Sequence, residues 1–575
     1  MVTKRVTQPM QAVRREDDVR VPMRDGIILR ADVYRPQGPG PFPVIVVRTP
    51  YGKQRQLEAE MVEALAARGY LVVIQDIRGR YASDGAFDPF YSPTRGEACT
   101  TDGYDTVEWA ARLPGSSGAV GTAGVSYMAW TQWKLAAARP PHLKAMFVGG
   151  MAPDSRTTWP GIFTRDRQLQ WALCSLVPDT RQRLGLPGPK TVEEAQRLWN
   201  EVERGKWLWF TPMADFPAHV LGGLAEHWRY WLSHHHCDWV RFGEKCGEVD
   251  VPIFHVTGWY DRVWSTIDLY SGMVRNGRTE ETRQRQKLLV GPWTHGFGFP
   301  HQVGVMDFGP EAELVCADVM ARWFDCCLKD IDNGVLEEPP VRLFVMGENR
   351  WREEHEWPLA RAVYTDYYFH SGGRANTPFG DGVLSPEPPA TEQPDSYLYD
   401  PRDPVMSLHL PNGQAAPGNV RVHDDRQDIL VYQTPPLGQD IEVTGPLEVK
   451  MHAASSAPDT DWTVRLVDVH PDGLAVNLSH GIVRARYRDS WDNPSLLEPG
   501  RSYEYRLRMV PTSNLFKAGH RIRLDISSSD FPNYDRNHNT GLDYWADATF
   551  AIARQTILHD AAHPSRIILP VVPRR

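Results

Sequence analysis

The chain has no excess of positive charge and no long run of apolar residues. Its 63 Lys and Arg residues are outnumbered by 72 Asp and Glu residues, which gives a formal net charge of −9 at pH 7. Nucleic-acid binding needs a basic face, so this balance predicts no nucleic-acid partner. No apolar run approaches the length of a membrane span, and residues 1–18 lack the apolar core of a signal peptide. We therefore expect no membrane contact.

Cysteine is also scarce. The 7 cysteines are scattered and odd in number, which does not predict a disulfide framework and favours a cytoplasmic location. The run SHHHCDW at 233–239 does not predict a metal site, because consecutive histidines point in different directions on a helix. Cys237 and Cys246 do not form a CxxC pair. We expect no metal and no cofactor.

The 575 residues are too many for one ordinary domain. Three kinds of sequence pattern occur along the chain. Short apolar strands alternate with amphipathic helices over 1–152 and again over 247–358, which predicts one α/β domain with a parallel sheet. Residues 153–246 have helical spacing interrupted by prolines, which predicts a helical insertion. Short alternating segments over 359–575 predict an all-β sandwich or jelly roll.

One serine lies between a predicted strand and a predicted helix. In GTAGVSYMAW (121–130), Ser126 fits the Gly-x-Ser-x-Gly elbow of esterases, except that Met128 replaces the second glycine. The short motif alone also fits a structural turn serine. The similar segment PGSSGAV (114–120) lies in a predicted loop, so we interpret Ser117 as a turn residue.

The chain supplies partners for Ser126 in the order of the α/β-hydrolases. Asp261 ends the predicted strand PIFHVTGWYD, and His295 follows the predicted strand KLLVGPW. Each lies just past the carboxyl end of a strand, where α/β sheets place their sites. Singly, such residues are more often caps or structural side chains, but together they predict a Ser–His–Asp triad. The Tyr127 N–H and the Tyr51 hydroxyl, from RTPYGK, are candidate oxyanion donors, although Tyr51 also fits a packing role.

These residues give the chain a specific resemblance to a known family. It resembles the cocaine esterase-like serine hydrolases, which are related to α-amino acid ester hydrolases, glutaryl acylases and X-prolyl dipeptidyl peptidases. The matching segments extend from near residue 20 to past 540 and are VPMRDGI, RTPYGK, VIQDIRGRYASDG, GVSYMAWTQW, GWYDR, GPWTHG, VRLFVMGENRWR and SSSDFPNYDRNHNTG.

The resemblance implies a fold and a set of roles. The fold is an α/β-hydrolase domain with an inserted helical cap and a C-terminal jelly roll. The family elbow reads Gly-x-Ser-Tyr, so Met128 is ordinary here. The resemblance assigns Ser126, Asp261 and His295 to the triad, and Tyr51 with the Tyr127 amide to the oxyanion hole. It implies a small-molecule ester as partner and leaves a homodimer open.

The residues after the triad aspartate bear on the substrate. In the amino-ester relatives, acidic residues at this place bind the ammonium group of the substrate. Here Arg262, Val263 and Trp264 follow Asp261, so we expect no requirement for an α-amino group. Arg262 either attracts a carboxylate on the acyl chain or forms a surface ion pair.

Aromatic residues open the predicted insertion. Trp159, Phe163 and Trp171 suit the surroundings of an aromatic or bulky acyl group, although packing inside the cap is the alternative for each. The sequence therefore predicts a serine carboxylesterase acting on neutral esters with such acyl groups. The alternatives are an amidase or acylase with the same triad, for example a glutaryl acylase, and a catalytically inactive binding protein.

Overall fold

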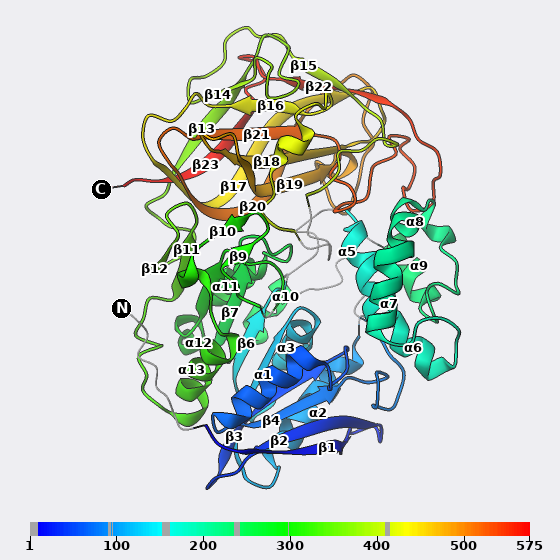
Figure 1. The fold of residues 1–575 in the computed structure, drawn as a ribbon, viewed down its shortest axis with the longest axis vertical. Coiled ribbons are helices and arrows are strands. Elements are labelled where there is room, and N and C mark those ends of the chain that lie inside the picture. The colour runs from blue at the N-terminus through cyan, green and yellow to red at the C-terminus, as the bar shows by residue number, and fades with distance from the viewer. Residues whose placement is uncertain are drawn as a thin grey trace.

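The computed structural model describes residues 10–89, 92, 94, 96–151, 161–234, 242–296, 298–408 and 415–574. Figure 1 shows three regions: an α/β region at the bottom, a group of helices at the right and a β domain at the top. Trp159 and the residues His235, His236 and Cys237 of the histidine run lie outside the described part.

A ten-stranded sheet forms the core of the α/β region, in the order β1-β2-β4-β3-β5-β6-β7-β8-β11-β12. The strands from β4 to β11 run parallel, whereas β2 and β12 pair antiparallel with their neighbours. Their bounds are β1 (Val13–Pro22), β2 (Ile28–Pro36), β3 (Phe42–Thr49), β4 (Leu71–Asp76), β5 (Ser116–Val125), β6 (Leu143–Gly149), β7 (Ile253–Gly258), β8 (Lys287–Gly291), β11 (Val341–Val345) and β12 (Arg350–Glu354).

Helices cover both faces of this sheet. One face carries α2 and α3, and α1 and α13 belong to the cluster of buried residues on the other. Both faces are therefore buried, which explains why the central strands are continuous apolar runs. The helices are α1 (Gln56–Ala67), α2 (Ala98–Ala111), α3 (Tyr127–Ala137), α11 (Thr266–Asn276), α12 (Glu280–Gln284) and α13 (Cys316–Lys329). Within the described part of the chain, no helix combines the length and apolar character needed to cross a membrane.

The chain between β6 and β7 forms a group of short helices, which we call the insertion. Buried tryptophans hold it together: Trp199, Trp207, Trp228 and Trp231. Its elements are α5 (Arg165–Gln170), the π-helical turn η1 (Trp171–Leu176), α6 (Val177–Leu184), α7 (Val192–Leu198), the π-helical turn η2 (Trp199–Glu203), α8 (Arg204–Trp209), η3 (Met213–Asp215), α9 (Ala225–Ser233), α10 (Phe242–Lys245) and η4 (Cys246–Glu248). Trp171 opens a π-helical turn, a local irregularity that is frequent at functional sites.

Three short elements lie between β8 and α13, before the chain returns to the α/β sheet. They are β9 (Gln302–Val303), β10 (Met306–Asp307) and η5 (Pro310–Ala312). The C-terminal β domain contains β13 (Val363–His370), β14 (Val383–Ser385), β15 (Asp395–Tyr399), η6 (Val420–His423), β16 (Leu430–Gln433), β17 (Ile441–Ser455), β18 (Asp461–Val469), β19 (Ala475–Arg484), η7 (Ala485–Tyr487), β20 (Ser502–Phe516), β21 (Arg521–Ser527), β22 (Ala553–Leu558) and β23 (Arg566–Val572).

The β domain is a closed barrel rather than the jelly roll that the sequence predicted. Its eleven strands form one sheet, and β23 closes it by pairing with β17. Closure depends on β17, a strand of 15 residues that pairs with β20, β22 and β23 along its length. The all-β prediction was right, but the pairing of strands far apart in sequence decides between the two architectures. Closure also removes sheet edges that would otherwise invite association.

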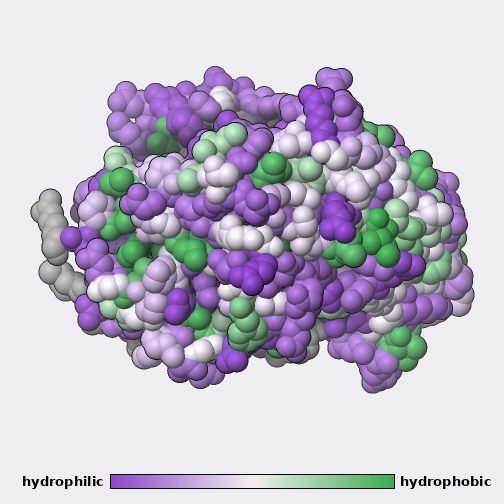
Figure 2. Space-filling view, turned by 90° about the horizontal axis from the view of Figure 1, so that it is seen from above, coloured by the Kyte–Doolittle hydropathy of each residue, from purple (hydrophilic) through white to green (hydrophobic). Residues whose placement is uncertain are grey.

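Figure 2 shows the molecule from above the β domain. Polar side chains cover most of this face, and apolar ones form separate spots among them. The described residues on this face therefore form no broad apolar surface of the kind that marks a docking site.

Candidate active site

Ser126 stands at the junction of β5 and α3. Its backbone angles are φ 63° and ψ −125°, which are strained for a residue with a side chain. Such strain is typical of the turn that projects a hydrolase nucleophile above its sheet. Tyr127 is the first residue of α3, so its N–H is among those without an intrahelical acceptor.

Two residues explain how this turn is packed. A Cβ atom at Gly124 would lie 2.4 Å from the Cβ of Met128, so only glycine lets the strand approach the helix here. Met128 is 3% exposed and packs in the core, which explains why the second glycine of the esterase motif is not needed.

His295 and Asp261 form a hydrogen-bonded pair beyond the ends of β8 and β7. The distance from His295 Nδ1 to Asp261 Oδ1 is 2.9 Å. Because an ionised carboxylate can only accept, Nδ1 carries the hydrogen and Nε2 presents a lone pair. The N–H of Val263 donates to Asp261 Oδ1 at 2.8 Å and fixes the carboxylate. At Gly150, a Cβ atom would lie 2.7 Å from the imidazole Cε1, so glycine makes room for the pair.

Tyr51 lies in the turn after β3 and contacts the insertion. The indole Nε1–H of Trp171 donates to the Tyr51 hydroxyl oxygen at 3.1 Å, which leaves the hydroxyl hydrogen as a donor. The ring centroids of Tyr51 and Tyr127 are 6.5 Å apart, and those of Tyr127 and Trp171 are 6.2 Å apart. The structure therefore brings these three predicted residues together.

Arg167 is a site residue that the sequence analysis missed. It lies on α5, and its Nη2 donates to His295 Nε2 at 3.2 Å. In the segment RDRQLQ it has the pattern of a solvated helix charge, so no sequence signal marks it. This contact covers the nitrogen that a general base needs for accepting a proton.

Burial and neighbouring charges together leave the pKa values of both His295 and Asp261 below their ordinary values. Burial lowers the pKa of His295; Asp261 opposes this effect, but the positive charge of Arg167 adds to it. Burial alone would raise the pKa of Asp261, but the neighbouring His295 brings it below its ordinary value. The neutral imidazole and the ionised carboxylate are therefore the favoured forms.

The other predicted substrate residues lie in different surroundings. Phe163 is 3% exposed, and its ring packs on those of Trp228 and Trp231 inside the insertion. Arg262 is 8% exposed and so is not a surface residue. Burial and the nearby Arg167 lower the pKa of Arg262 to about 9.

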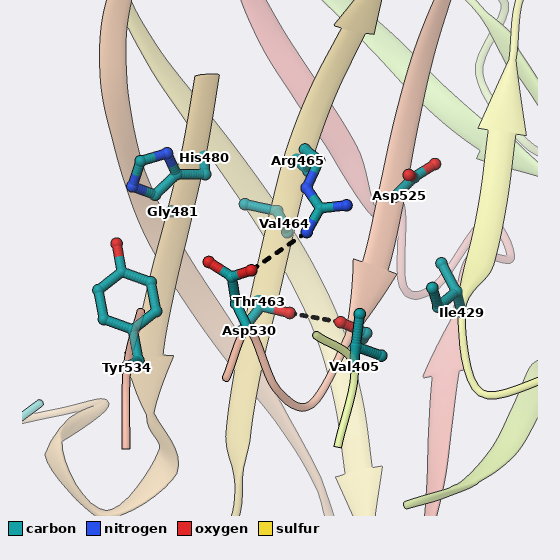
Figure 3. A pocket seen from close by; sticks show the side chains of 11 residues that line it. Val405, Ile429, Thr463, Val464, Arg465, His480, Gly481, Asp525, Asp530 and Tyr534 are labelled. Carbon is teal, nitrogen blue, oxygen red and sulfur yellow. Dashed lines mark hydrogen bonds and ion pairs between the residues drawn. The ribbon is translucent and has the colours of Figure 1, made fainter. Parts of the chain in front are cut away.

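A separate pocket lies inside the β domain (Figure 3). Arg465 on its wall donates to Asp530 at 3.2 Å, and the hydroxyls of Thr463 and Ser527 are 2.6 Å apart. Each of these two pairs of polar groups is joined by a hydrogen bond across the wall of the pocket.

Two family descriptions match the chain. The X-Pro dipeptidyl-peptidase (S15 family) description matches residues 25–297, and that of the X-Pro dipeptidyl-peptidase C-terminal non-catalytic domain matches residues 333–568. Cocaine esterase of Rhodococcus sp. (strain MB1 Bresler) is 36% identical over 587 residues, covering 97% of this chain and 98% of the relative.

Solved structures agree with this likeness. An α-amino acid ester hydrolase has a TM-score of 0.83 at 25% identity, covering 99% of both chains. An aminopeptidase from the marine sediment archaeon Thaumarchaeota archaeon has a TM-score of 0.80 at 25% identity, covering 98% of this chain and 97% of that one. The chain is therefore a serine ester hydrolase. It belongs to the cocaine esterase-like family, with an S15-family region followed by a C-terminal all-β domain.

Proposed function

We propose that the protein hydrolyses carboxylic esters through an acyl-enzyme formed on Ser126, with His295 as base and Asp261 as its orienting acid. The main support for the proposal is the set of contacts that connects the strained Ser126 with the imidazole of His295. The Ser126 N–H donates to the Gly149 carbonyl at 2.9 Å, and the next residue, Gly150, adjoins the imidazole of His295.

The chemistry follows from the two nitrogens of His295. Nε2 accepts the Ser126 proton while Oγ attacks the acyl carbonyl, and Nδ1–H keeps its bond to Asp261. The Tyr127 N–H and the Tyr51 hydroxyl donate to the developing oxyanion. The proton then passes to the leaving alcohol, and water releases the acyl group by the same steps. Before the first step, Arg167 must leave Nε2, because both groups use the same lone pair.

The first candidate substrate class is the neutral ester with an aromatic or bulky acyl group. Its support is the half-buried Trp171, which bonds to Tyr51 and adjoins Tyr127 and Trp231. A flat acyl group next to the oxyanion donors would meet these rings. In this proposal Phe163 does not contact the acyl group itself but packs against Trp231 and so supports the position of that ring. Trp159 belongs to this proposal on sequence grounds alone.

The second candidate class is the ester or amide whose acyl chain carries its own carboxylate. A specific observation favours it: Arg167 and Arg262 both lie near His295, and both have lowered pKa values because of burial. Among the residues that the structure describes, none supplies a carboxylate that pairs with Arg167. An incoming carboxylate would draw Arg167 from Nε2. The same positive charges disfavour an α-amino substrate.

A matched panel of p-nitrophenyl esters separates these classes. Benzoate against acetate tests the aromatic class, and glutarate against valerate tests the second carboxylate. Phenylglycinate against phenylacetate tests the α-amino group. We expect benzoate to exceed acetate and phenylacetate to exceed phenylglycinate in kcat/KM. If glutarate exceeds valerate, and Arg167→Met reverses that order, the carboxylate class replaces the aromatic one. Anilides of the preferred acyl group test amide cleavage.

The inactive-binding alternative predicts no turnover by any ester of the panel. If the unchanged protein hydrolyses an ester of the panel and Ser126→Ala does not, the inactive-binding alternative is excluded. Turnover that persists in this variant contradicts the assignment of the nucleophile.

A further inference from the structure

Three metal-ligating side chains meet at one end of the β domain. Strands β18 and β21 run antiparallel, and their last pair joins Val469 to Arg521. If this pairing is continued by one residue beyond the strands, His470 lies opposite His520. Side chains two residues apart on a strand share a face, so Asp468 lies on the face of His470. About 50 residues separate the two histidines, so no spacing motif reveals the cluster.

The ligand atoms of this cluster converge. His520 Nδ1 is 2.8 Å from Asp468 Oδ1, and His470 Nε2 is 3.8 Å from Asp468 Oδ2. One ligand atom from each of the three residues lies within 4.8 Å of the others. Tetrahedral zinc with bonds of about 2.0–2.1 Å holds its ligand atoms about 3.3 Å apart. Side-chain shifts on the order of 1 Å would therefore complete the geometry.

We propose that Asp468, His470 and His520 bind one zinc ion. Two imidazole nitrogens with one carboxylate oxygen suit zinc, whereas calcium and magnesium prefer all-oxygen sites. On binding, His520 gives up its Nδ1 hydrogen bond to Asp468 and carries its single hydrogen on Nε2. Water takes the fourth position.

Polar groups behind the ligands support this site. The Asn514 amide donates to Asp468 Oδ2 at 3.3 Å and orients the carboxylate. Tyr260 is 6% exposed, its hydroxyl has no hydrogen-bond partner within the described part of the chain, and the charge of Asp468 acts on it. This hydroxyl is therefore available to a water on the metal. Tyr260 directly precedes Asp261, and Asn514 forms a β-bridge with Met346, so the cluster lies where the β domain meets the α/β region.

Tight turns fix both histidines. The His470 N–H donates to the Leu474 carbonyl at 2.8 Å, and its own carbonyl accepts from Gly473 at 2.9 Å. The His520 N–H donates to the Lys517 carbonyl at 3.0 Å. A metal would tie these two turns together, so its expected effect is structural: a higher melting temperature with little change in ester turnover at 25 °C.

The test uses the full chain stripped of metal by a chelator. Isothermal titration with Zn²⁺ is expected to give one equivalent, and Co²⁺ in the same site is expected to give the visible absorption of tetrahedral cobalt. The variants His470→Gln and His520→Gln are expected to bind Zn²⁺ at least about 100-fold more weakly. Mg²⁺ at equal concentration is expected to leave the melting temperature unchanged.

The matched control is a second histidine pair in the same domain. His452 and His563 have ring centroids 5.3 Å apart, and the His452 side chain is 21% exposed against 23% for His470. The variants His452→Gln and His563→Gln are expected to bind Zn²⁺ as the unchanged protein does. No binding by the unchanged protein, equal binding by His470→Gln, or a cobalt spectrum with a thiolate charge-transfer band would each overturn the proposal. Circular dichroism of each variant distinguishes lost ligation from misfolding.

Discussion

Two histidines of this protein, the half-buried His295 in the α/β region and the buried His559 in the β domain, have opposite pKa shifts. Burial lowers the pKa of His295, and the attraction of Asp261 does not restore it. Burial would lower the pKa of His559 as well, but Asp395 and Glu392 raise it above the ordinary value. His559 is fully buried, with its Nε2 2.9 Å from Asp395 and its Nδ1 3.0 Å from Glu392.

The difference shows that neighbouring charges decide whether the pKa of a histidine inside the protein is raised or lowered. At His559, two carboxylates outweigh burial and favour the protonated imidazole, which joins Asp395 and Glu392. At His295, burial and the nearby Arg167 outweigh the attraction of the single carboxylate of Asp261, and they favour the neutral imidazole that the proposed role as general base requires. Substitutions at these two histidines and at the residues around them test this contrast.

Ser126→Ala is expected to lower kcat for ester hydrolysis by about 10⁴-fold or more, because loss of the nucleophile removes the covalent route. Steady-state kinetics with a p-nitrophenyl ester measure it. The control is Ser117→Ala, since Ser117 belongs to the similar motif but is exposed at the start of β5. A large loss in the control and none in Ser126→Ala would reverse the assignment.

His559→Gln is expected to reduce the free energy of unfolding of the β domain by about 3–5 kcal/mol, the cost of leaving buried charges without their partner. Urea titration followed by circular dichroism measures it. The control is His563→Gln, because the side chain of His563 is 33% exposed. An unchanged unfolding midpoint in His559→Gln would mean that the carboxylates are not ionised against the histidine.

The same variant is expected to change the pH dependence of stability. The pKa of His559 is higher in the folded than in the unfolded protein, so its contribution is complete below the unfolded value of about 6.5. This contribution disappears as the pH rises through the folded pKa. Melting temperatures measured across this window should fall less steeply in His559→Gln than in the unchanged protein.

Tyr51→Phe is expected to lower kcat by roughly 10²–10³ with little change in KM, as for the loss of one oxyanion donor. Trp171→Phe keeps an aromatic ring but removes the indole donor to Tyr51, so its loss should be smaller. Initial rates over a range of ester concentrations separate kcat from KM. Equal kcat in Tyr51→Phe and the unchanged protein would return Tyr51 to a packing role.

Arg167→Met is expected to move the acid limb of the kcat/KM profile to higher pH. Ester hydrolysis needs neutral His295, so activity rises with pH through the pKa of that residue. Removing the positive charge removes one of the causes that lower this pKa. Arg167→Lys keeps the charge and should leave the limb near its original place. A limb that moves to lower pH in Arg167→Met would contradict the electrostatic account.

Much of the fold could be predicted because its signals are local. The alternation of strand and helix from β3 to β8 is expressed in continuous apolar runs, and the all-β character of the C-terminal region in short alternating segments. Barrel closure could not be predicted, because it depends on β17 meeting β23 more than a hundred residues later.

The same limit applies to the side chains. Ser126, Asp261 and His295 follow strand ends in a characteristic order, so the sequence could predict them as a candidate triad. Arg167 and the cluster at His470 acquire their meaning only from partners far along the chain. Whether an arginine on a helix is solvated or rests against a histidine is decided by tertiary packing.

The most direct test of the account is covalent labelling of the nucleophile. The protein is treated with a fluorophosphonate, digested and analysed by mass spectrometry, beside the variants Ser126→Ala and His295→Gln. The account predicts one adduct, on the peptide that contains Ser126, with no adduct in Ser126→Ala and much slower labelling in His295→Gln. An adduct on another serine, or labelling at an unchanged rate in His295→Gln, would contradict it.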